Sequence, residues 1–231
     1  MKYIVDTAMN VKGMISHDEV LFLANMAKET HGQIVEVGSY HGRSAIALCM
    51  GQATRMEKNP PVVCVDPFES YEAVSSVVSG VVYHGEQDYH QFANNVATYN
   101  IKHLRCDSTE AVKVFRDGEV ALLFLDGQHD FEHVKSDFDA WLPKLRAHAV
   151  VIFHDNDEAG VKELLNLLGA DRRWLEVGGA RLMTALRWYP DAVESPHPFT
   201  PSPKGEGELK SKPTGKAKKN PTAVGHWSDK S

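Results

Sequence analysis

The stretch QIVEVGSYHGRSAIALCM, from Gln33 to Met50, decides the fold. It opens with the short apolar run Gln33–Val37, which is typical of a strand, and it closes with Ser44–Met50, which favours a helix. Between the two lie Gly38 and Gly42, and glycines at such a turn let the backbone bend sharply and bring a ligand close to the following helix N-terminus. A strand, a glycine-rich turn and a helix in this order indicate an α/β protein.

The same alternation continues along the chain. Further strand-like runs are Pro61–Val65, Lys102–Cys106, Val120–Leu125 and Ala149–Phe153. Helical segments are expected from a capping box at Ser16–Glu19 to about Lys28, over Asp88–Tyr99 and Ser108–Phe115, from Phe131 to about Leu145, and over Ala159–Leu168. Trp174–Val177 and Arg181–Arg187 predict a terminal hairpin with a tight turn at Gly178-Gly179. We therefore expect a doubly wound α/β sheet, mostly parallel and Rossmann-like, with helices on both faces.

Polar residues follow nearly every predicted strand. They are Glu36 to Gly42, Asp66, Asp107-Ser108, Asp126 and Asp155-Asn156. A single acidic residue after a strand could merely end it, but ligands of such sheets bind outside the carboxyl ends of the strands, where the strand order reverses. Because polar residues follow so many of the strands, we expect one ligand site at the edge of the sheet where the strands end.

The spacing of the first polar ends suggests what the ligand contains. Asp66 follows the second strand, where a carboxylate can accept hydrogen bonds from both hydroxyls of a ribose, so we expect a nucleoside. Asp107 and Ser108 follow the third strand and are placed to meet an adenine edge. The turn reads G-x-x-x-G and lacks the G-x-G-x-x-G of dinucleotide sites, which argues against an NAD-linked oxidoreductase.

Length and composition set the remaining bounds. The 231 residues suit one domain, which we expect over residues 1–190, and the Pro-, Gly- and Lys-rich residues 191–231 predict a disordered tail. The net charge of -6 argues against nucleic acid as the main partner. No apolar run is long enough for a membrane span, and the three cysteines show no metal-binding spacing. We expect a soluble cytoplasmic protein without membrane contact.

Taken together, several segments resemble the class I S-adenosylmethionine-dependent methyltransferases, and most closely the group called methyltransferase family 24. These segments are VEVGSYHGRSAIAL, VVCVDPFES, CDSTEAV, LFLDGQHDFEHVKSDFDAWLPKL and AVVIFHDN, in this order between Gln33 and Asn156. The resemblance implies a seven-stranded sheet in the order 3-2-1-4-5-7-6, with the terminal hairpin supplying a reversed last strand.

The resemblance also implies a set of cofactor contacts. Glu36, Gly38 and Gly42 would line the methionine part of S-adenosylmethionine, Asp66 would hold its ribose, and Asp107 and Ser108 would flank its adenine. The remaining members of the expected set are Ser39, Tyr40 and Asp126.

On the acceptor side, Asp126, Asp155 and Asn156 resemble the Mg²⁺ triad of catechol-type O-methyltransferases. Oxygen ligands of this kind suit Mg²⁺, although Asp155-Asn156 could instead simply end a strand. His129 stands where the catechol-type pattern has a lysine, and its ordinary pKa of about 6.5 suits a general base. We expect Asp126 and His129 to be the catalytic pair, with a helix-capping histidine as the alternative. Strand alternation predicts that His154 lies on the opposite side of the strand from Asp155, and a place near the pocket is left open for it.

These observations predict a methyltransferase, and more sharply an O-methyltransferase that acts on a small hydroxylated metabolite with metal or His129 assistance. Two alternatives remain: a non-catalytic nucleoside-binding module, and a metal-dependent enzyme of another class on the same fold. The segment Glu69–Gly85 and the N-terminal helix are expected to select the acceptor. Assembly into a homo-oligomer is left open.

Overall fold

The structure is a computed structural model that describes residues 1–74 and 79–192. Its helices are α1 (Lys2–Met9), α2 (His17–Glu29), α3 (Arg43–Ala53), α4 (Glu86–Val96), α5 (Ser108–Ala111), α6 (Phe131–Trp141) and α7 (Ala159–Gly169). Its strands are β1 (Gln33–Val37), β2 (Val62–Val65), β3 (Ser70–Val74), β4 (Ser79–His84), β5 (Ile101–Leu104), β6 (Val120–Leu125), β7 (Leu145–Phe153), β8 (Trp174–Ala180) and β9 (Met183–Trp188). Apart from Asp191 and Ala192, the predicted tail lies outside the described residues.

Seven strands form the main sheet, in the order β5-β2-β1-β6-β7-β9-β8. Numbered along the chain within this sheet alone, the order is 3-2-1-4-5-7-6, which confirms the expected topology. Strand β9 is antiparallel to both of its neighbours, and the other described pairings of the sheet are parallel. The chain therefore winds outward in two directions from β1 and β6, and the ends of these two strands mark the point where ligands bind in such sheets.

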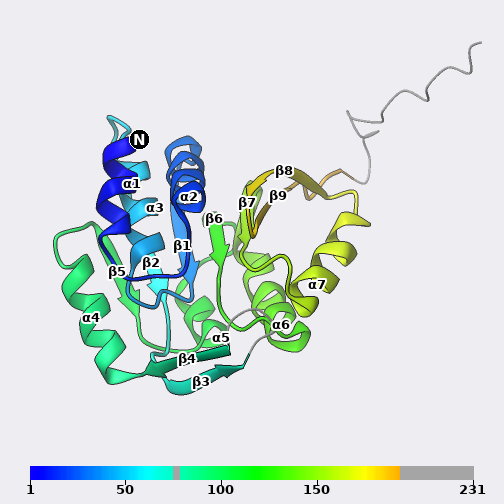
Figure 1. The fold of residues 1–231 in the computed structure, drawn as a ribbon. Helices are drawn as coiled ribbons and strands as arrows, with labels where there is room; N and C mark the ends of the chain where they lie inside the picture. Colours follow the sequence, from blue (N-terminus) through cyan, green and yellow to red (C-terminus); the bar gives the residue numbers. More distant parts are fainter. Residues whose placement is uncertain (75–78, 193–231) are drawn as a thin grey trace, which may run out of the picture. The chain divides into compact units, whose positions relative to one another are not determined.

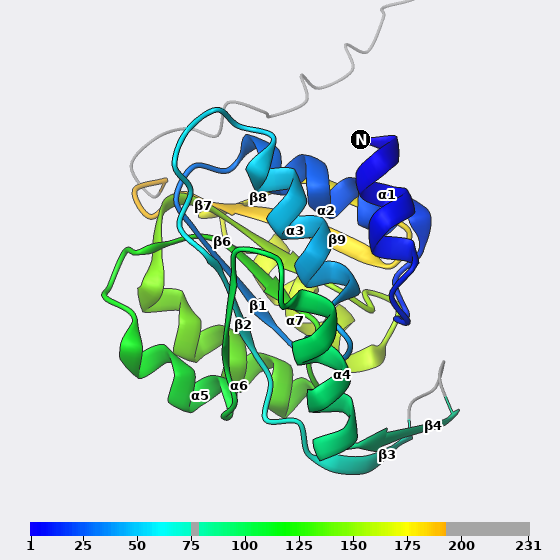
Figure 2. The ribbon, with the colours of Figure 1, turned by 90° about the vertical axis from the view of Figure 1, so that its left-hand side faces the viewer.

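Side chains that alternate along the central strands form two hydrophobic layers. Ile34, Phe124 and Ile152 face the layer that contains residues of α1 to α4. Their sequence neighbours Val35, Leu123 and Val151 face the layer that contains residues of α5 to α7. Figures 1 and 2 show the sheet between α1, α2 and α3 on one face and α5, α6 and α7 on the other. The continuous apolar runs thus become strands that are buried on both faces.

The capping box at Ser16 begins α2, as the sequence predicts. The backbone N–H of Ser16 and its hydroxyl both donate to Glu19 Oε2, each at 2.7 Å. This pairing satisfies polar groups that a helix N-terminus otherwise leaves without partners. Glu19 is buried, and its second carboxylate oxygen accepts the backbone N–H of Leu182 at 3.1 Å, which ties α2 to the terminal hairpin.

The prediction that Gly178 and Gly179 form the turn of that hairpin is wrong. Both glycines lie within β8, and the turn is formed by Arg181 and Leu182, with Arg181 at φ 50°. Gly178 has φ 147° at a register shift, and a Cβ on Gly179 would lie 2.4 Å from the carbonyl oxygen of Met183. The two glycines therefore permit a bulge and a close strand approach, which sequence alone does not separate from a turn.

The segment between β2 and α4, for which the sequence makes no clear prediction, forms a hairpin of β3 and β4. Its strands pair in antiparallel fashion from Ser70 opposite His84 to Val74 opposite Ser79. Figures 1 and 2 show this hairpin beyond the carboxyl ends of the central strands. It therefore stands at the edge of the sheet where a ligand is expected.

Candidate functional site

The turn after β1 brings the ends of β1, β2 and β6 into contact. Gly38 has φ 84°, and its N–H donates to the carbonyl of Val65 at 2.9 Å. A Cβ on Gly38 would lie 2.0 Å from the carbonyl oxygen of Asp126, so only glycine fits there. Gly42, at φ 90°, is the N-cap of α3. The two glycines thus permit a sharp turn and the start of a helix.

Asp66 fastens this turn to the end of β2. Its Oδ2 accepts the N–H groups of Ser39 at 2.8 Å and Tyr40 at 3.1 Å, while Oδ1 accepts the N–H of Phe68 at 2.8 Å. Burial raises the pKa of Asp66, and the three N–H groups oppose that shift. Each carboxylate oxygen has two lone pairs, so Oδ1 can still accept a ligand hydroxyl. Asp66 therefore fixes the conformation of the loop and also has an oxygen that can bind a ligand hydroxyl.

Glu36 is a fully buried carboxylate at the end of β1. Among residues 1–74 and 79–192, neither of its oxygens has a hydrogen-bond partner. Burial raises the pKa of Glu36 to about 7, and the nearby side chains of Ser44, Cys64 and Ser39 offset only part of this effect. A buried polar group without a partner is costly, which points to a ligand that completes the site.

Replacing Glu36 by Gln should change how stability depends on pH. The folded pKa of about 7 lies above the ordinary 4.5, so the folded chain keeps a proton that the unfolded chain releases. The free energy of unfolding of the wild type should therefore fall as pH rises from about 4.5 to about 7. Denaturant titrations across this window should show Glu36→Gln gaining up to about 3 kcal/mol relative to the wild type. If the free energy of unfolding depended on pH in the same way in both proteins, Glu36 would not be a buried, protonated carboxyl group.

The predicted adenine contacts differ in their surroundings. Asp107 is exposed and is the N-cap of α5. Ser108 is buried, and its hydroxyl accepts the indole N–H of Trp141 at 2.8 Å. The Ser108 side chain thus serves packing between α5 and α6 in this structure, whereas Asp107 remains open to a ligand.

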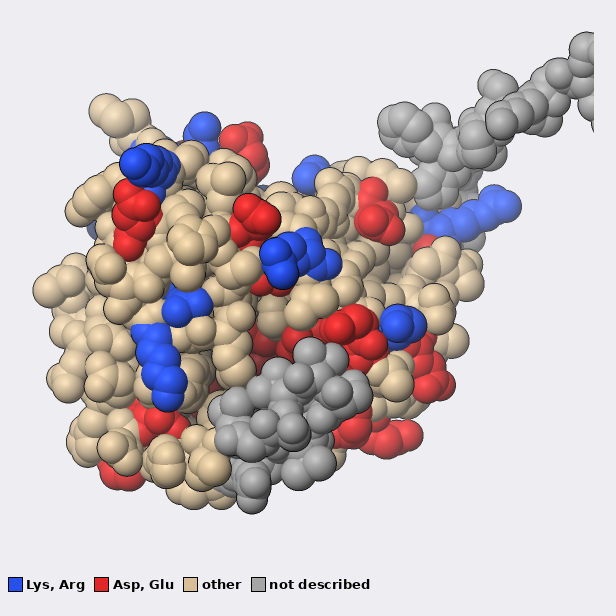
Figure 3. Space-filling view, in the orientation of Figure 1, with Lys and Arg blue, Asp and Glu red and all other residues tan. Residues whose placement is uncertain are grey.

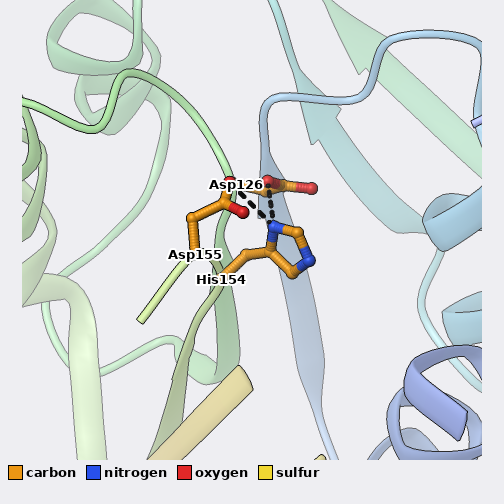
Figure 4. A group of neighbouring side chains, drawn as sticks. All are labelled: Asp126, His154 and Asp155. Atoms are coloured by element: carbon orange, nitrogen blue, oxygen red, sulfur yellow. Dashed lines mark ion pairs between the residues drawn. The ribbon is translucent and has the colours of Figure 1, made fainter. Parts of the chain in front are cut away.

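Asp126, His154 and Asp155 converge at the ends of β6 and β7 (Figure 4). His154 Nδ1 lies 3.1 Å from Asp126 Oδ1 and 3.0 Å from Asp155 Oδ2. On the other side of the ring, Nε2 lies 3.4 Å from Oε1 of Glu19 in α2. Burial would lower the pKa of His154, but the carboxylates of Asp126, Asp155 and Glu19 raise it to about 12. The cluster thus holds a concentrated negative charge around one imidazole.

His154 lies on the face that alternation predicts, and it still contacts Asp155 because regular alternation stops at the end of β7. His154 lies on the same face as Ile152, as alternation requires, and its ring contacts Phe124 edge to face. Asp155, however, has φ 51°, an unusual conformation for a residue other than glycine. This left-handed residue turns the chain so that the two side chains lie together.

His129 stands beside this cluster. Its Nε2 lies 2.8 Å from Asp155 Oδ2, and its side chain is about one third exposed. Burial would lower the pKa of His129, but Asp155, with Asp126 and Glu158, raises it above 6.5. The two histidines in turn lower the pKa of Asp155, although burial opposes this. His133, by contrast, is exposed and pairs with Asp130, the N-cap of α6.

Asn156, the third member of the predicted metal triad, contacts the terminal hairpin through its two N–H groups. Its Nδ2 donates to Thr184 Oγ1 in β9 at 3.0 Å, and its N–H donates to the carbonyl of Leu182. The structure brings Asp126 and Asp155 of the expected triad together, with His154 between them, and the place of Asn156 in the triad stays a prediction. The sequence signal for this cluster is a His-Asp pair directly after an apolar strand. Such a pair can belong to a site or merely end the strand, so the signal does not decide between the two.

His41 lies in the glycine turn, and the sequence alone does not show whether its side chain faces the cofactor or the solvent. It is buried, and its Nε2 lies 2.8 Å from Asp88 Oδ1 in α4, while Asp88 Oδ2 accepts the N–H of His84 at 2.6 Å. The Tyr40 ring stacks on His41 at 3.8 Å and meets Tyr83 edge to face at 5.4 Å. The glycine turn is thus connected to α4 and to β4.

The surface around the site is acidic on the face in Figure 3, where Asp and Glu side chains gather around α6 and α7. In the part of the chain that the structure describes, no helix has both the length and the apolar character required to cross a membrane.

A family model described as "Methyltransferase domain", that of methyltransferase family 24, matches residues 35–156. A curated relative from Sinorhizobium fredii (strain NBRC 101917 / NGR234), described as an uncharacterized protein, is 32% identical over 151 residues. That match covers 64% of this chain and only 15% of the relative.

Solved structures share the fold at low sequence identity. A protein of Corynebacterium glutamicum has a TM-score of 0.58 at 14% identity, with 82% of this chain and 91% of that chain covered. An O-methyltransferase of Bacillus cereus in complex with S-adenosylhomocysteine has a TM-score of 0.51 at 18% identity, covering 80% and 89%. An O-methyltransferase of Streptomyces achromogenes involved in tomaymycin synthesis, in complex with S-adenosylmethionine, has a TM-score of 0.54 at 14% identity, covering 81% and 88%.

The fold, with its strand order and glycine turn, agrees with a family model that spans more than half of the 231 residues. The chain therefore belongs to methyltransferase family 24.

Proposed function

We propose that this protein is an S-adenosylmethionine-dependent O-methyltransferase of small hydroxylated acceptors, with His129 as general base. The observation that carries the proposal is the pair of His129 and Asp155, 2.8 Å apart, beside Asp126 at the switch point of the sheet. The Bacillus cereus and Streptomyces achromogenes structures support it, since both are described as O-methyltransferases with S-adenosylhomocysteine or S-adenosylmethionine bound.

The residues around the glycine turn fit the cofactor. Gly38 and Gly42 keep the loop close to the strand ends, and the unpartnered carboxylate of Glu36 suits the ammonium of the methionine part. Asp66 retains a lone pair on Oδ1 for a ribose hydroxyl, and Asp107 lies exposed for the adenine. When bound, S-adenosylmethionine would supply an electrophilic sulfonium methyl, and the leaving group would be the neutral thioether S-adenosylhomocysteine.

His129 has the surroundings of a general base. Its Nε2 faces the Asp155 carboxylate, which favours the tautomer with a proton on Nε2 and leaves Nδ1 free to accept a proton. As Nδ1 takes the acceptor's hydroxyl proton, the oxygen forms its bond to the methyl carbon while the carbon–sulfur bond breaks. Asp155 then stabilises the imidazolium, as the carboxylate of a catalytic triad does.

A divalent cation fits the carboxylates of Asp126 and Asp155, whose oxygens approach the same nitrogen of His154. Such a cation would lower the pKa of an acceptor hydroxyl and orient it. Asn156 is the third ligand expected from the sequence; its Nδ2 donates to Thr184 Oγ1, and its amide oxygen would be the atom that binds.

The β3–β4 hairpin, part of the segment expected to select the acceptor, contacts Tyr40. Tyr83 of β4 contacts its ring, and Lys12, which follows α1, lies 5.5 Å from the ring centroid. The acidic surroundings in Figure 3 and the net charge of -6 favour a small acceptor over a nucleic acid. We propose that an acceptor with an apolar or aromatic body lies between the hairpin and His129.

Cofactor binding provides the first test of this function. Calorimetry should show S-adenosylhomocysteine binding to the wild type, and Asp66→Ala should weaken that binding roughly 10- to 100-fold, because a charged hydrogen-bond partner contributes about 1.5–3 kcal/mol. Asp117→Ala, which changes an exposed carboxylate paired with Lys144, is the matched control and should bind normally. Absence of heat with both S-adenosylmethionine and S-adenosylhomocysteine would refute the proposal. Binding without any transfer of a labelled methyl to hydroxylated metabolites would instead indicate a non-catalytic nucleoside-binding protein.

A further inference from the structure

The buried carboxylate of Asp88 connects the glycine turn to the base of the β3–β4 hairpin. Its Oδ1 lies 2.8 Å from Nε2 of His41, and its Oδ2 accepts the N–H of His84, the last residue of β4, at 2.6 Å. The His41 and Asp88 side chains are each only 8% exposed, so their contact is shielded from water. Hydrogen bonds to a carboxylate are strong, and they are stronger still away from water. One side chain therefore holds two segments that are distant in the sequence.

Asp66 fastens the other strand of the hairpin to the same turn. Its Oδ2 accepts the N–H of Tyr40, while its Oδ1 accepts the N–H of Phe68, which lies just before β3. After β4, Gly85 has φ 52°, and a Cβ placed on it would lie 3.1 Å from the carbonyl oxygen of Phe68. The two ends of the hairpin are therefore close together, and each is bound to a carboxylate that also holds the glycine turn.

The same contacts set the place of two tyrosine rings. The His41 ring stacks on the Tyr40 ring, with centroids 3.8 Å apart and planes 10° apart. Tyr40 in turn meets Tyr83, the neighbour of His84 in β4, edge to face at 5.4 Å. Single ring contacts of this kind are weak. The hydrogen bond from His84 to Asp88 therefore does most to fix where the Tyr83 ring lies relative to Tyr40.

Helix α4 has other contacts that keep it on the turn. Asn95 Nδ2 donates to the carbonyl of His41 at 2.9 Å. Val96 is buried, and a Cβ on Gly42 would lie only 2.8 Å from its Cγ1. Figure 2 shows the first turn of α4 next to the hairpin. Loss of the Asp88 carboxylate should therefore release the hairpin from the turn without detaching the helix.

We infer that His41 and Asp88 are positioning residues for the methyl acceptor. They hold the base of the hairpin, and with it Tyr83, at a fixed place relative to the glycine turn that receives the cofactor. Because a bound cofactor restrains that turn, the restraint should reach β4 through His41 and Asp88. His41 thus acts through Asp88 and the hairpin. The inference rests on the proposed function for the place of the acceptor beside Tyr40 and Tyr83.

Hydrogen exchange of the full-length protein provides the direct test, with S-adenosylhomocysteine as the probe. In the wild type, saturating S-adenosylhomocysteine should slow exchange of the β4 amides by about 5-fold or more, as coupled sites do. Asp88→Ala should bind it within about 5-fold of the wild-type affinity but lose the slowing in β4. His41→Phe keeps a ring on Tyr40 without a partner for Asp88, so it should lose the slowing as well. Asp88→Asn, whose amide oxygen can still accept the N–H of His84, should keep part of it.

Glu86→Ala is the matched control, because it removes an exposed carboxylate from the first turn of the same helix, where Glu86 pairs with Arg105. This variant should show the wild-type slowing of exchange in β4.

Kinetics with catechol as the probe acceptor complete the test. Asp88→Ala should raise the KM for catechol about 10-fold while kcat changes less than about 3-fold, the pattern of a residue that supports binding without contact to the reacting atoms. Slowing of β4 exchange that persists in Asp88→Ala and His41→Phe, or a wild type that binds S-adenosylhomocysteine without such slowing, would overturn the inference. If methyl transfer to catechol occurs with the same KM in Asp88→Ala, the inference alone fails. If the β4 amides respond as expected but the wild type transfers no methyl to any hydroxylated acceptor, the proposed function alone fails.

Discussion

His129→Ala is expected to lower the rate of methyl transfer by about 10²- to 10⁴-fold, which is the usual contribution of a positioned general base. The reason is local: His129 is the partly exposed titratable group that contacts the Asp155 carboxylate, at 2.8 Å, next to the strand ends. The rate would be measured as transfer of label from tritium-labelled S-adenosylmethionine to a panel of hydroxylated metabolites. Calorimetry should find the affinity for S-adenosylhomocysteine unchanged, because His129 is placed on the acceptor side.

The control for this variant is the histidine four residues further along. His133→Ala also removes an imidazole, but that side chain is exposed and pairs only with Asp130 among its described contacts, so transfer should proceed at the wild-type rate. Added imidazole should restore part of the activity of His129→Ala, because it can occupy the vacated space and accept the proton. Equal loss in both variants, or full activity in His129→Ala, would remove His129 from the mechanism.

Much of this arrangement could be predicted because it follows from strand periodicity. Apolar runs such as Val120–Leu125 and Ala149–Phe153 identify the buried strands, and the acidic residues after them must gather where parallel strands end. Alternation also places Glu36 on the face of Ile34, and His154 on the face of Ile152. The reversed strand and the order of the sheet came from resemblance to a family, not from periodicity.

The parts that could not be predicted depend on single backbone angles or on contacts across the fold. The φ of 51° at Asp155 turns this residue back toward His154, and no pattern in the sequence indicates it. The Ser108 hydroxyl accepts the indole N–H of Trp141, a residue 33 positions away. Glu19 is identifiable as a capping residue, yet its second oxygen lies near His154 only because α2 packs against the terminal hairpin. Tertiary contacts of this kind assign a side chain a second role.

Gly38→Ala is expected to lower the free energy of unfolding by about 3 kcal/mol or more. Placing a Cβ at φ 84° costs about 1–2 kcal/mol. In addition, that Cβ would lie 2.0 Å from the carbonyl oxygen of Asp126, and relieving the clash requires β1 and β6 to separate at the switch point. Overpacking of this kind adds about 1–3 kcal/mol. Denaturant titration monitored by circular dichroism would measure the change, and the remaining folded protein should bind S-adenosylhomocysteine weakly.

Gly118→Ala separates the two causes, because Gly118 also has a positive φ, of 71°, but its added Cβ meets nothing within 4 Å. This control should show only the backbone cost of about 1–2 kcal/mol and normal cofactor binding. The excess loss in Gly38→Ala then measures the contact between the glycine turn and the end of β6. If both variants lost the same stability and bound the cofactor equally, the close approach of Gly38 to Asp126 would not hold in solution. The site built on that approach would then need a different geometry, because Asp126 is the residue that connects the turn to the acceptor side.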